Sequence, residues 1–175
     1  MKTELRYGII GAGSMGREHI ENIKVMGGAA VTAISDPHVP SQEAALAMAP
    51  GAKVFSDHRA LLDSGLVDAV VIATPNDTHA AVLKDALATN LAVFVEKTLA
   101  TTVEDLKSIL SWDDKRSAMT WMGLEYRFMP PVAEAIARAQ EGEAGKIHQV
   151  SIREHREPFY PKVDNWNRFA ERTGG

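Results

Sequence analysis

Six short apolar segments alternate with helical patterns along this chain, and this alternation constrains the fold more than any other feature. The segments rich in Val and Ile cover residues 6–10, 30–35, 53–55, 68–74, 92–96 and 118–124. Several show little alternation of apolar and polar residues, which is typical of strands covered on both faces. The pattern predicts an α/β fold with a right-handed, doubly wound parallel sheet.

Helical patterns lie between these predicted strands. They cover about residues 15–26, 41–48 and 77–90. Thr101-Thr102-Val103-Glu104 has the pattern of a capping box that opens a further helix, and Pro130-Pro131 opens the last one. Beyond Gly145, residues 146–157 have the pattern of one long polar strand, for which the sequence offers no partner.

A glycine-rich turn joins the first predicted strand to the first predicted helix. It consists of Gly11-Ala12-Gly13-Ser14-Met15-Gly16 and has the pattern G-x-G-x-x-G. In such a turn Gly11 permits the tight bend, Gly13 lets a pyrophosphate approach the backbone, and Gly16 lets the helix pack closely on the strand. Free N–H groups at the helix start attract phosphates. The turn predicts a Rossmann fold whose six loop residues bind a dinucleotide.

Asp36 completes this pattern, because it follows the turn by about twenty residues and ends the second predicted strand. A carboxylate there accepts hydrogen bonds from both ribose hydroxyls of NAD and repels the 2′-phosphate of NADP. The next residues are Pro37 and His38, so no Arg follows at once. The sequence therefore favours NAD over NADP.

A second cluster of polar residues follows the fourth and fifth predicted strands. Open α/β sheets bind ligands at these carboxyl ends. The residues in question are Thr74, Pro75, Asn76 and His79 after the fourth strand, and Glu96 and Lys97 after the fifth. Three of these residues also have a structural interpretation: Asn76 can cap a helix, His79 can lie on a helix surface, and Glu96 can simply pair with Lys97.

With these motifs in order, the chain resembles the Gfo/Idh/MocA family of oxidoreductases. The resemblance rests on the glycine-rich turn, Asp36, the segment from Ala73 to His79, and Glu96-Lys97. It implies NAD(P)-dependent hydride transfer at a sugar or polyol carbon. Lys97 matches the family's active-site lysine, which would polarise a hydroxyl or relay its proton. It also implies that Thr74, Pro75, Asn76, His79 and Glu96 line the cofactor.

The chain departs from the family in two respects. The family usually has Pro after the lysine, whereas this chain has Thr98, so we expect the cis-capable peptide to be lost and Lys97 to be presented differently. Family members are also about twice as long. We expect a Rossmann domain at 1–125 and, at 126–175, the connecting helix and truncated start of a substrate and oligomerisation domain. The family's assisting Asp and His have no counterpart here, which predicts dinucleotide binding with little or no dehydrogenase activity.

Composition limits the other functions. The net charge is −4 without a strongly basic stretch, which argues against a nucleic-acid partner. The chain has no cysteine, no His spacing typical of a metal site, no apolar stretch of membrane-spanning length and no signal-peptide pattern at its start. We therefore expect a cytoplasmic protein whose partners are a sugar or polyol, a missing C-terminal domain or further copies of itself.

Two alternatives to a dehydrogenase remain at the sequence level. One is a non-catalytic dinucleotide-binding module or redox sensor, which the short length favours and Glu96-Lys97 argue against. The other is a methyltransferase, whose fold also has a glycine-rich first turn and an acid after the second strand. The third glycine and the polar cluster disfavour this second alternative.

Overall fold

The structure, a computed structural model, describes residues 4–155, 158 and 161–174. The chain forms two compact units. The first contains the residues up to Gly123 together with those from Lys162 onward, and the second runs from Leu124 to Pro161. The residues from Lys162 onward thus lie with the first unit, although the sequence had placed them with the second domain.

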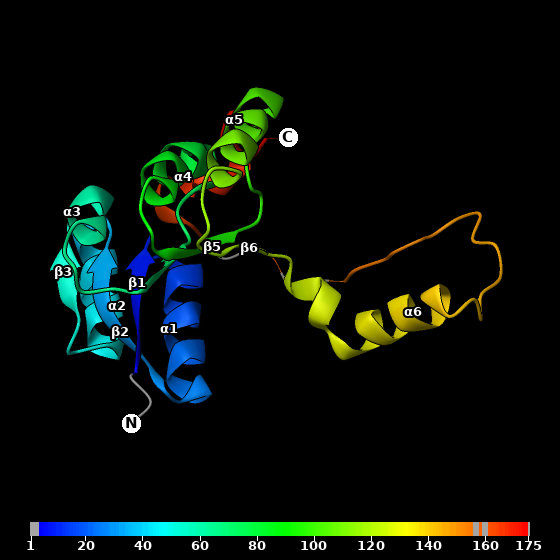
Figure 1. Ribbon diagram of the computed structural model, residues 1–175, viewed down its shortest axis with the longest axis horizontal. Coiled ribbons are helices and arrows are strands. Elements are labelled where there is room, and N and C mark those ends of the chain that lie inside the picture. The colour runs from blue at the N-terminus through cyan, green and yellow to red at the C-terminus, as the bar shows by residue number, and fades with distance from the viewer. Residues whose placement is uncertain (1–3, 156–157, 159–160, 175) are drawn as a thin grey trace. The chain divides into compact units, whose positions relative to one another are not determined.

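A six-stranded, fully parallel sheet forms the centre of the first unit (Figure 1). Its strands are β1 (Leu5–Ile10), β2 (Ala29–Ser35), β3 (Lys53–Phe55), β4 (Ala69–Ile72), β5 (Ala92–Glu96) and β6 (Thr120–Gly123). They lie in the order β3-β2-β1-β4-β5-β6. The predicted fold class is confirmed, and each predicted strand of the sheet is present to within about two residues at either end.

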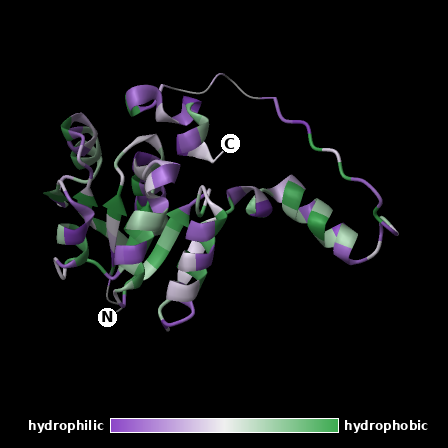
Figure 2. Cartoon of the chain, turned by 90° about the horizontal axis from the view of Figure 1, so that it is seen from above, coloured by the Kyte–Doolittle hydropathy of each residue, from purple (hydrophilic) through white to green (hydrophobic). Residues whose placement is uncertain are grey.

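Helices cover both faces of this sheet. α1 (Ser14–Met26) and α2 (Val39–Met48) pack on one face, and the other face carries α3 (His58–Leu62), α4 (His79–Leu87) and α5 (Val103–Asp113). Because both faces are buried, the strands are apolar along most of their length, as Figure 2 shows.

The strands supply both cores from alternate residues. In β4, Val70 and Ile72 pack with α4 and α5, whereas Val71 between them packs with α1 and α2. In β1, Ile10 packs on the face covered by α4 and α5, whereas Ile9 packs on the face covered by α1 and α2. Successive strand residues point to opposite faces, so a run without polar alternation fills two cores at once.

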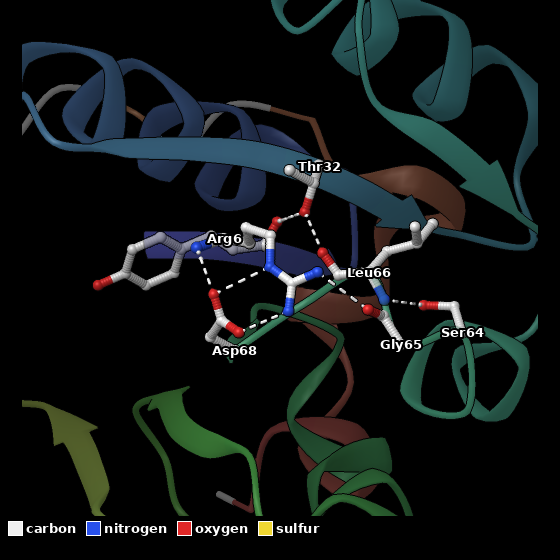
Figure 3. Close-up of polar contacts among 7 residues, drawn as sticks. Arg6, Thr32, Ser64, Gly65, Leu66 and Asp68 are labelled. Atoms are coloured by element: carbon white, nitrogen blue, oxygen red, sulfur yellow. Dashed lines mark hydrogen bonds and ion pairs between the residues drawn. The ribbon is translucent and has the colours of Figure 1, made fainter. Parts of the chain in front are cut away.

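An ion pair joins β1 to the segment before β4 at the amino edge of the sheet (Figure 3). The Arg6 guanidinium donates to both carboxylate oxygens of Asp68, at 2.6 and 3.1 Å, and to the Gly65 carbonyl at 3.0 Å. Asp68 also accepts the Arg6 backbone N–H at 3.0 Å. These contacts hold the pKa of Asp68 below its ordinary value, first through the Arg6 side chain and then through its backbone N–H.

Several helices differ from the sequence prediction. The short helix α3 was not predicted, since five residues are too few for a clear helical period. The helix expected over residues 77–90 is divided into the 3₁₀ turn η1 (Asn76–Thr78) and α4. The N-cap of α5 is Thr102, not Thr101, because the Thr102 hydroxyl accepts the Asp105 N–H at 3.1 Å.

The second unit contains the 3₁₀ turn η2 (Glu125–Phe128) and α6 (Pro130–Gln140), followed by Gly142 at φ 83°. The predicted helix after Pro130 is therefore present. The long strand predicted over residues 146–157 was wrong for residues 146–155, which form no strand; residues 156–157 lie outside the described part. Extended backbone becomes a β-strand only when a neighbouring strand accepts its hydrogen bonds.

Candidate functional site

The loops after β1, β4 and β5 meet at the carboxyl edge of the sheet. From β1 the sheet extends one way through β2 and β3, and the other way through β4, β5 and β6. The winding direction therefore reverses between β1 and β4, where open α/β sheets hold their ligands. Two backbone bonds tie this point together: Gly11 N–H donates to Ser35 O at 2.8 Å, and Ala73 N–H donates to Ile10 O at 2.8 Å.

The three glycines of the turn after β1 have different surroundings. Gly11 has φ +93°, and a Cβ there would lie 2.7 Å from the backbone of Ala73 and Thr74. A Cβ at Gly16 would lie only 1.9 Å from the Gly11 carbonyl oxygen. Gly13, in contrast, faces open space, with nothing within 4 Å. Two glycines are thus required by packing, while the third leaves room for a ligand.

The start of α1 faces the space beside Gly13. Its N-cap, Gly13, offers no side-chain cap, and its first turn contains no acidic residue. The N–H groups there retain their partial positive charge, which favours a phosphate. Ser14, the first helical residue, is exposed, whereas Met15 is half-buried and Ala12 is fully buried.

Asp36 lies directly after β2 and folds toward the same turn. Its Oδ2 accepts the Ala12 N–H at 2.7 Å, and its Oδ1 accepts the His38 N–H at 2.8 Å. Each carboxylate oxygen can accept more than one hydrogen bond, so both can still receive ribose hydroxyls. The backbone bonds fix the carboxylate beside the glycine-rich turn.

The turn after β4 is held by its own polar groups. The Thr78 hydroxyl lies 2.8 Å from the Thr74 hydroxyl and 2.7 Å from the Pro75 carbonyl oxygen. Asn76 is half-buried, and its amide nitrogen donates to the Thr173 carbonyl at 3.3 Å. Thr74, Pro75 and Asn76 therefore form a fixed turn next to Gly11, while their role toward a cofactor stays a prediction.

His79 is fully buried at the start of α4. Its Nδ1 lies 2.6 Å from the Thr98 carbonyl oxygen and its Nε2 lies 3.0 Å from that of Thr74. The imidazole thus connects the turn after β4 to the turn after β5. Because no side-chain surface is exposed, any effect of His79 on a cofactor would pass through Thr74 and Thr98.

Lys97 is exposed immediately after β5, at the same edge as the glycine-rich turn. The expectation of a lost cis peptide was wrong, since the Lys97–Thr98 bond is cis without proline, with the Thr98 carbonyl beside the His79 ring. Glu96 meets His19 of α1 at 2.9 Å, and both side chains are mostly buried. Sequence analysis had assigned no role to His19.

The site therefore fits a dinucleotide: an open space before an uncapped helix start, a carboxylate at the end of β2, and a lysine after β5. The family model "Oxidoreductase family, NAD-binding Rossmann fold", GFO_IDH_MocA, matches residues 5–124. The chain belongs to the Gfo/Idh/MocA family. Its first unit is an NAD-binding Rossmann domain.

Relatives of this Gfo/Idh/MocA chain include several inositol dehydrogenases. Inositol 2-dehydrogenase of Corynebacterium glutamicum is 34% identical over 149 residues, which cover 84% of this chain and 44% of that protein. The structure of Lactobacillus casei myo-inositol dehydrogenase with NAD(H) and myo-inositol matches with TM-score 0.75 and 33% identity. That match covers 79% of this chain and 42% of the other.

A second similar structure contains a nucleotide sugar in addition to the cofactor. The Bordetella pertussis WlbA dehydrogenase, solved with NADH and UDP-GlcNAcA, has TM-score 0.75 and 26% identity, over 83% of this chain and 45% of that one. The chain spans less than half the length of each of these three proteins.

Sequence reasoning missed a segment that returns to this Gfo/Idh/MocA site. It contains the 3₁₀ turn η3 (Val163–Arg168) and α7 (Ala170–Thr173) and belongs to the first unit. Arg172 donates to Asp77 at 3.1 Å, and Lys162 donates to the Ser14 hydroxyl. Residues 162–174 show no periodic apolar pattern, so nothing in the sequence indicated where they pack.

Neither a membrane span nor a metal centre was found among the residues that the structure describes. No helix there is long and apolar enough to cross a bilayer. The same residues contain no group of three or more His, Asp or Glu side chains arranged to hold a metal ion.

Proposed function

We propose that this chain is the cofactor half of an NAD-dependent oxidoreductase that transfers hydride between a sugar or polyol carbon and nicotinamide. The observation that carries the proposal is the position of Lys97, an exposed amine at the same sheet edge as the glycine-rich turn and Asp36. The inositol dehydrogenases among the relatives support the substrate class.

Oxidation of a secondary alcohol releases a hydride from carbon and a proton from the hydroxyl. The bound nicotinamide supplies the hydride acceptor. In this proposal the Lys97 amine takes the hydroxyl proton and passes it on, or returns it in the reverse direction. The buried His79 imidazole, 2.6 Å from the Thr98 carbonyl, positions the turn that carries Lys97.

The cofactor preference follows from Asp36, whose carboxylate is fixed by the N–H groups of Ala12 and His38. We expect calorimetric titration to show tighter binding of NADH than of NADPH, because a 2′-phosphate would meet this carboxylate. Asp36→Ala should weaken NADH binding by roughly tenfold or more, since it removes charge-assisted hydrogen bonds to the ribose.

Glu43 provides a matched control for that titration. It lies on the exposed side of α2, so Glu43→Ala should leave the NADH affinity unchanged. Equal affinity of the native chain for NADH and NADPH would contradict the specificity assigned to Asp36. Failure to bind either nucleotide would contradict the proposed function.

We also propose that these 175 residues alone turn over substrate slowly or not at all. The chain spans 44% of the Corynebacterium glutamicum enzyme, so more than half of that enzyme has no counterpart in these residues. An assay with myo-inositol and NAD should detect NADH formation far below that of a full-length relative. A rate of NADH formation comparable to that of the full-length relative would contradict this proposal.

A non-catalytic dinucleotide-binding module is the second candidate, favoured by the same short span. Lys97→Met separates the two. In an enzyme, alone or completed by a substrate domain, this change removes turnover and leaves NADH affinity within about threefold. In a binding module there is no turnover to lose, and addition of a relative's substrate domain would not produce any.

The part of residues 126–175 that lies in the second unit, up to Pro161, would begin the substrate domain, which would be completed by further sequence or by copies of the chain. The absence of cysteine from the sequence fits a reducing cytoplasm.

A further inference from the structure

Lys162 brings a positive charge to the glycine-rich turn from the far end of the chain. Its ammonium donates to the Ser14 hydroxyl, across 148 residues of sequence. Ser14 is the first residue of α1, so the ammonium lies at the start of that helix. Lys162 is outside every motif on which the family resemblance rests.

The ammonium of Lys162 is held in a positive environment. Its pKa is lowered, mainly because burial removes water from the ammonium, and further by the positive charges of Lys97 and Arg17; Glu18 alone acts in the opposite direction. The first turn of α1 contains no acidic residue, and the helix start adds its own partial positive charge. Like charges gathered in this way favour an anion between them.

The segment that carries Lys162 is fastened at several points to the loops of the site. Arg172 bonds Asp77 at 3.1 Å, and the Thr173 carbonyl accepts from Asn76 at 3.3 Å. A Cβ on Gly174 would lie 3.2 Å from the Thr101 backbone, so the chain passes closely there. Because these contacts hold the segment in place, less conformational entropy is lost in keeping the ammonium at the turn.

We propose that Lys162 binds the pyrophosphate of the dinucleotide. The inference rests on the proposed function, and it adds a residue that the glycine-rich motif does not contain. The ammonium supplies a charge-assisted hydrogen bond to a phosphate oxygen, and Ser14 and the N–H groups of α1 supply neutral ones. With the anion present, the repulsion among Lys162, Lys97 and Arg17 is offset.

Titration of Lys162→Gln with ADP-ribose and with adenosine tests this assignment. ADP-ribose contains the pyrophosphate, whereas adenosine lacks it. We expect the dissociation constant for ADP-ribose to rise by roughly ten- to a hundredfold, as for loss of a charge-assisted bond, and that for adenosine to stay within about twofold. Raising the salt concentration should weaken ADP-ribose binding less in the variant than in the native chain.

Three further variants serve as controls. Lys162→Arg keeps the charge and should bind ADP-ribose within about fivefold of the native chain. Ser14→Ala removes the Lys162 partner without removing a charge and should have a smaller effect than Lys162→Gln. Lys24→Gln removes an exposed cation from the last turn of the same helix and should change nothing.

The outcomes distinguish this inference from the function on which it rests. Equal ADP-ribose affinity in Lys162→Gln and the native chain overturns the Lys162 assignment alone. Equal weakening of ADP-ribose and adenosine also overturns it, because Lys162 would then only support the fold. A native chain that binds neither ADP-ribose nor NADH overturns the proposed function, and the assignment with it.

Discussion

Gly13 and Gly16 stand three residues apart in one turn, yet different forces require them. Gly16 is required by packing, because a Cβ there would collide with the Gly11 carbonyl. Gly13 has φ −66°, which any residue adopts, and it faces open space. The fold around position 13 therefore does not require a glycine, which agrees with the proposed approach of a ligand to the backbone.

Alanine substitutions at these two glycines should separate stability from binding. Gly16→Ala places a Cβ 1.9 Å from the Gly11 oxygen, so we expect it to destabilise the domain by about 1–3 kcal/mol or more. Gly13→Ala should keep or slightly raise the melting temperature, because it reduces the freedom of the unfolded chain. It should still weaken NADH binding at least tenfold.

Thermal denaturation and NADH titration of both variants provide the measurement. A Gly13→Ala variant that binds NADH normally would contradict close approach of the pyrophosphate. A Gly16→Ala variant with native stability would contradict the packing of α1 against the turn.

At the scale of elements, helix α5 begins one residue later than its sequence motif suggests. Thr101-Thr102-Val103-Glu104 matches the capping box, but the Thr102 hydroxyl accepts the Asp105 N–H and also donates to the Asp105 carboxylate, at 2.8 Å. The overlapping sequence from Thr102 to Asp105 provides the cap. Adjacent threonines leave the register ambiguous until the backbone is known.

Thr102→Ala should lower the free energy of unfolding by about 1 kcal/mol, the usual loss for a removed N-cap. Thr101→Ala is the matched control and should cost less, because the Thr101 hydroxyl does not cap α5. Urea denaturation of the two variants measures the difference. A larger loss of unfolding free energy for Thr101→Ala than for Thr102→Ala would instead support Thr101 as the N-cap.

At the scale of the whole molecule, the pairing of β1 with β4 joins the two halves of the sheet. The Arg6–Asp68 ion pair supports this pairing at the amino edge, away from the ligand site. Both side chains are more than a third exposed, at 42% and 38%, so solvent screens the pair and its contribution is small.

The stability of the chain should depend on Asp68 at acid pH. The pKa of Asp68 is lowered in the folded state, so its contribution is present above the ordinary aspartate pKa of about 3.9. It is lost as the pH falls through the lowered value. The native chain should therefore exceed Asp68→Asn in stability at pH 7, and the difference should shrink below about pH 4. Urea denaturation at both pH values measures this; a difference independent of pH would contradict the ion pair.

Much of this organisation was predictable, because it depends on neighbours in sequence. The strands followed from apolar runs, and the turn after β1 followed from its three glycines and the helix after it. The placement of Asp36 at the same edge followed as well, since parallel strands end together. Contacts such as Arg6 with Asp68 involve residues far apart in sequence and have no local signature.

The α/β fold, the parallel sheet, the glycine-rich turn and the family could all be inferred from the sequence, because backbone geometry and strand–helix periodicity are local properties. The tertiary structure was needed to show that His79 is buried between two turns, that Glu96 contacts His19, and that Lys162 contacts Ser14. It also decided that residues 146–155 form no strand. Each of these depends on which distant groups are present to fill space or accept hydrogen bonds, and local patterns do not encode that information.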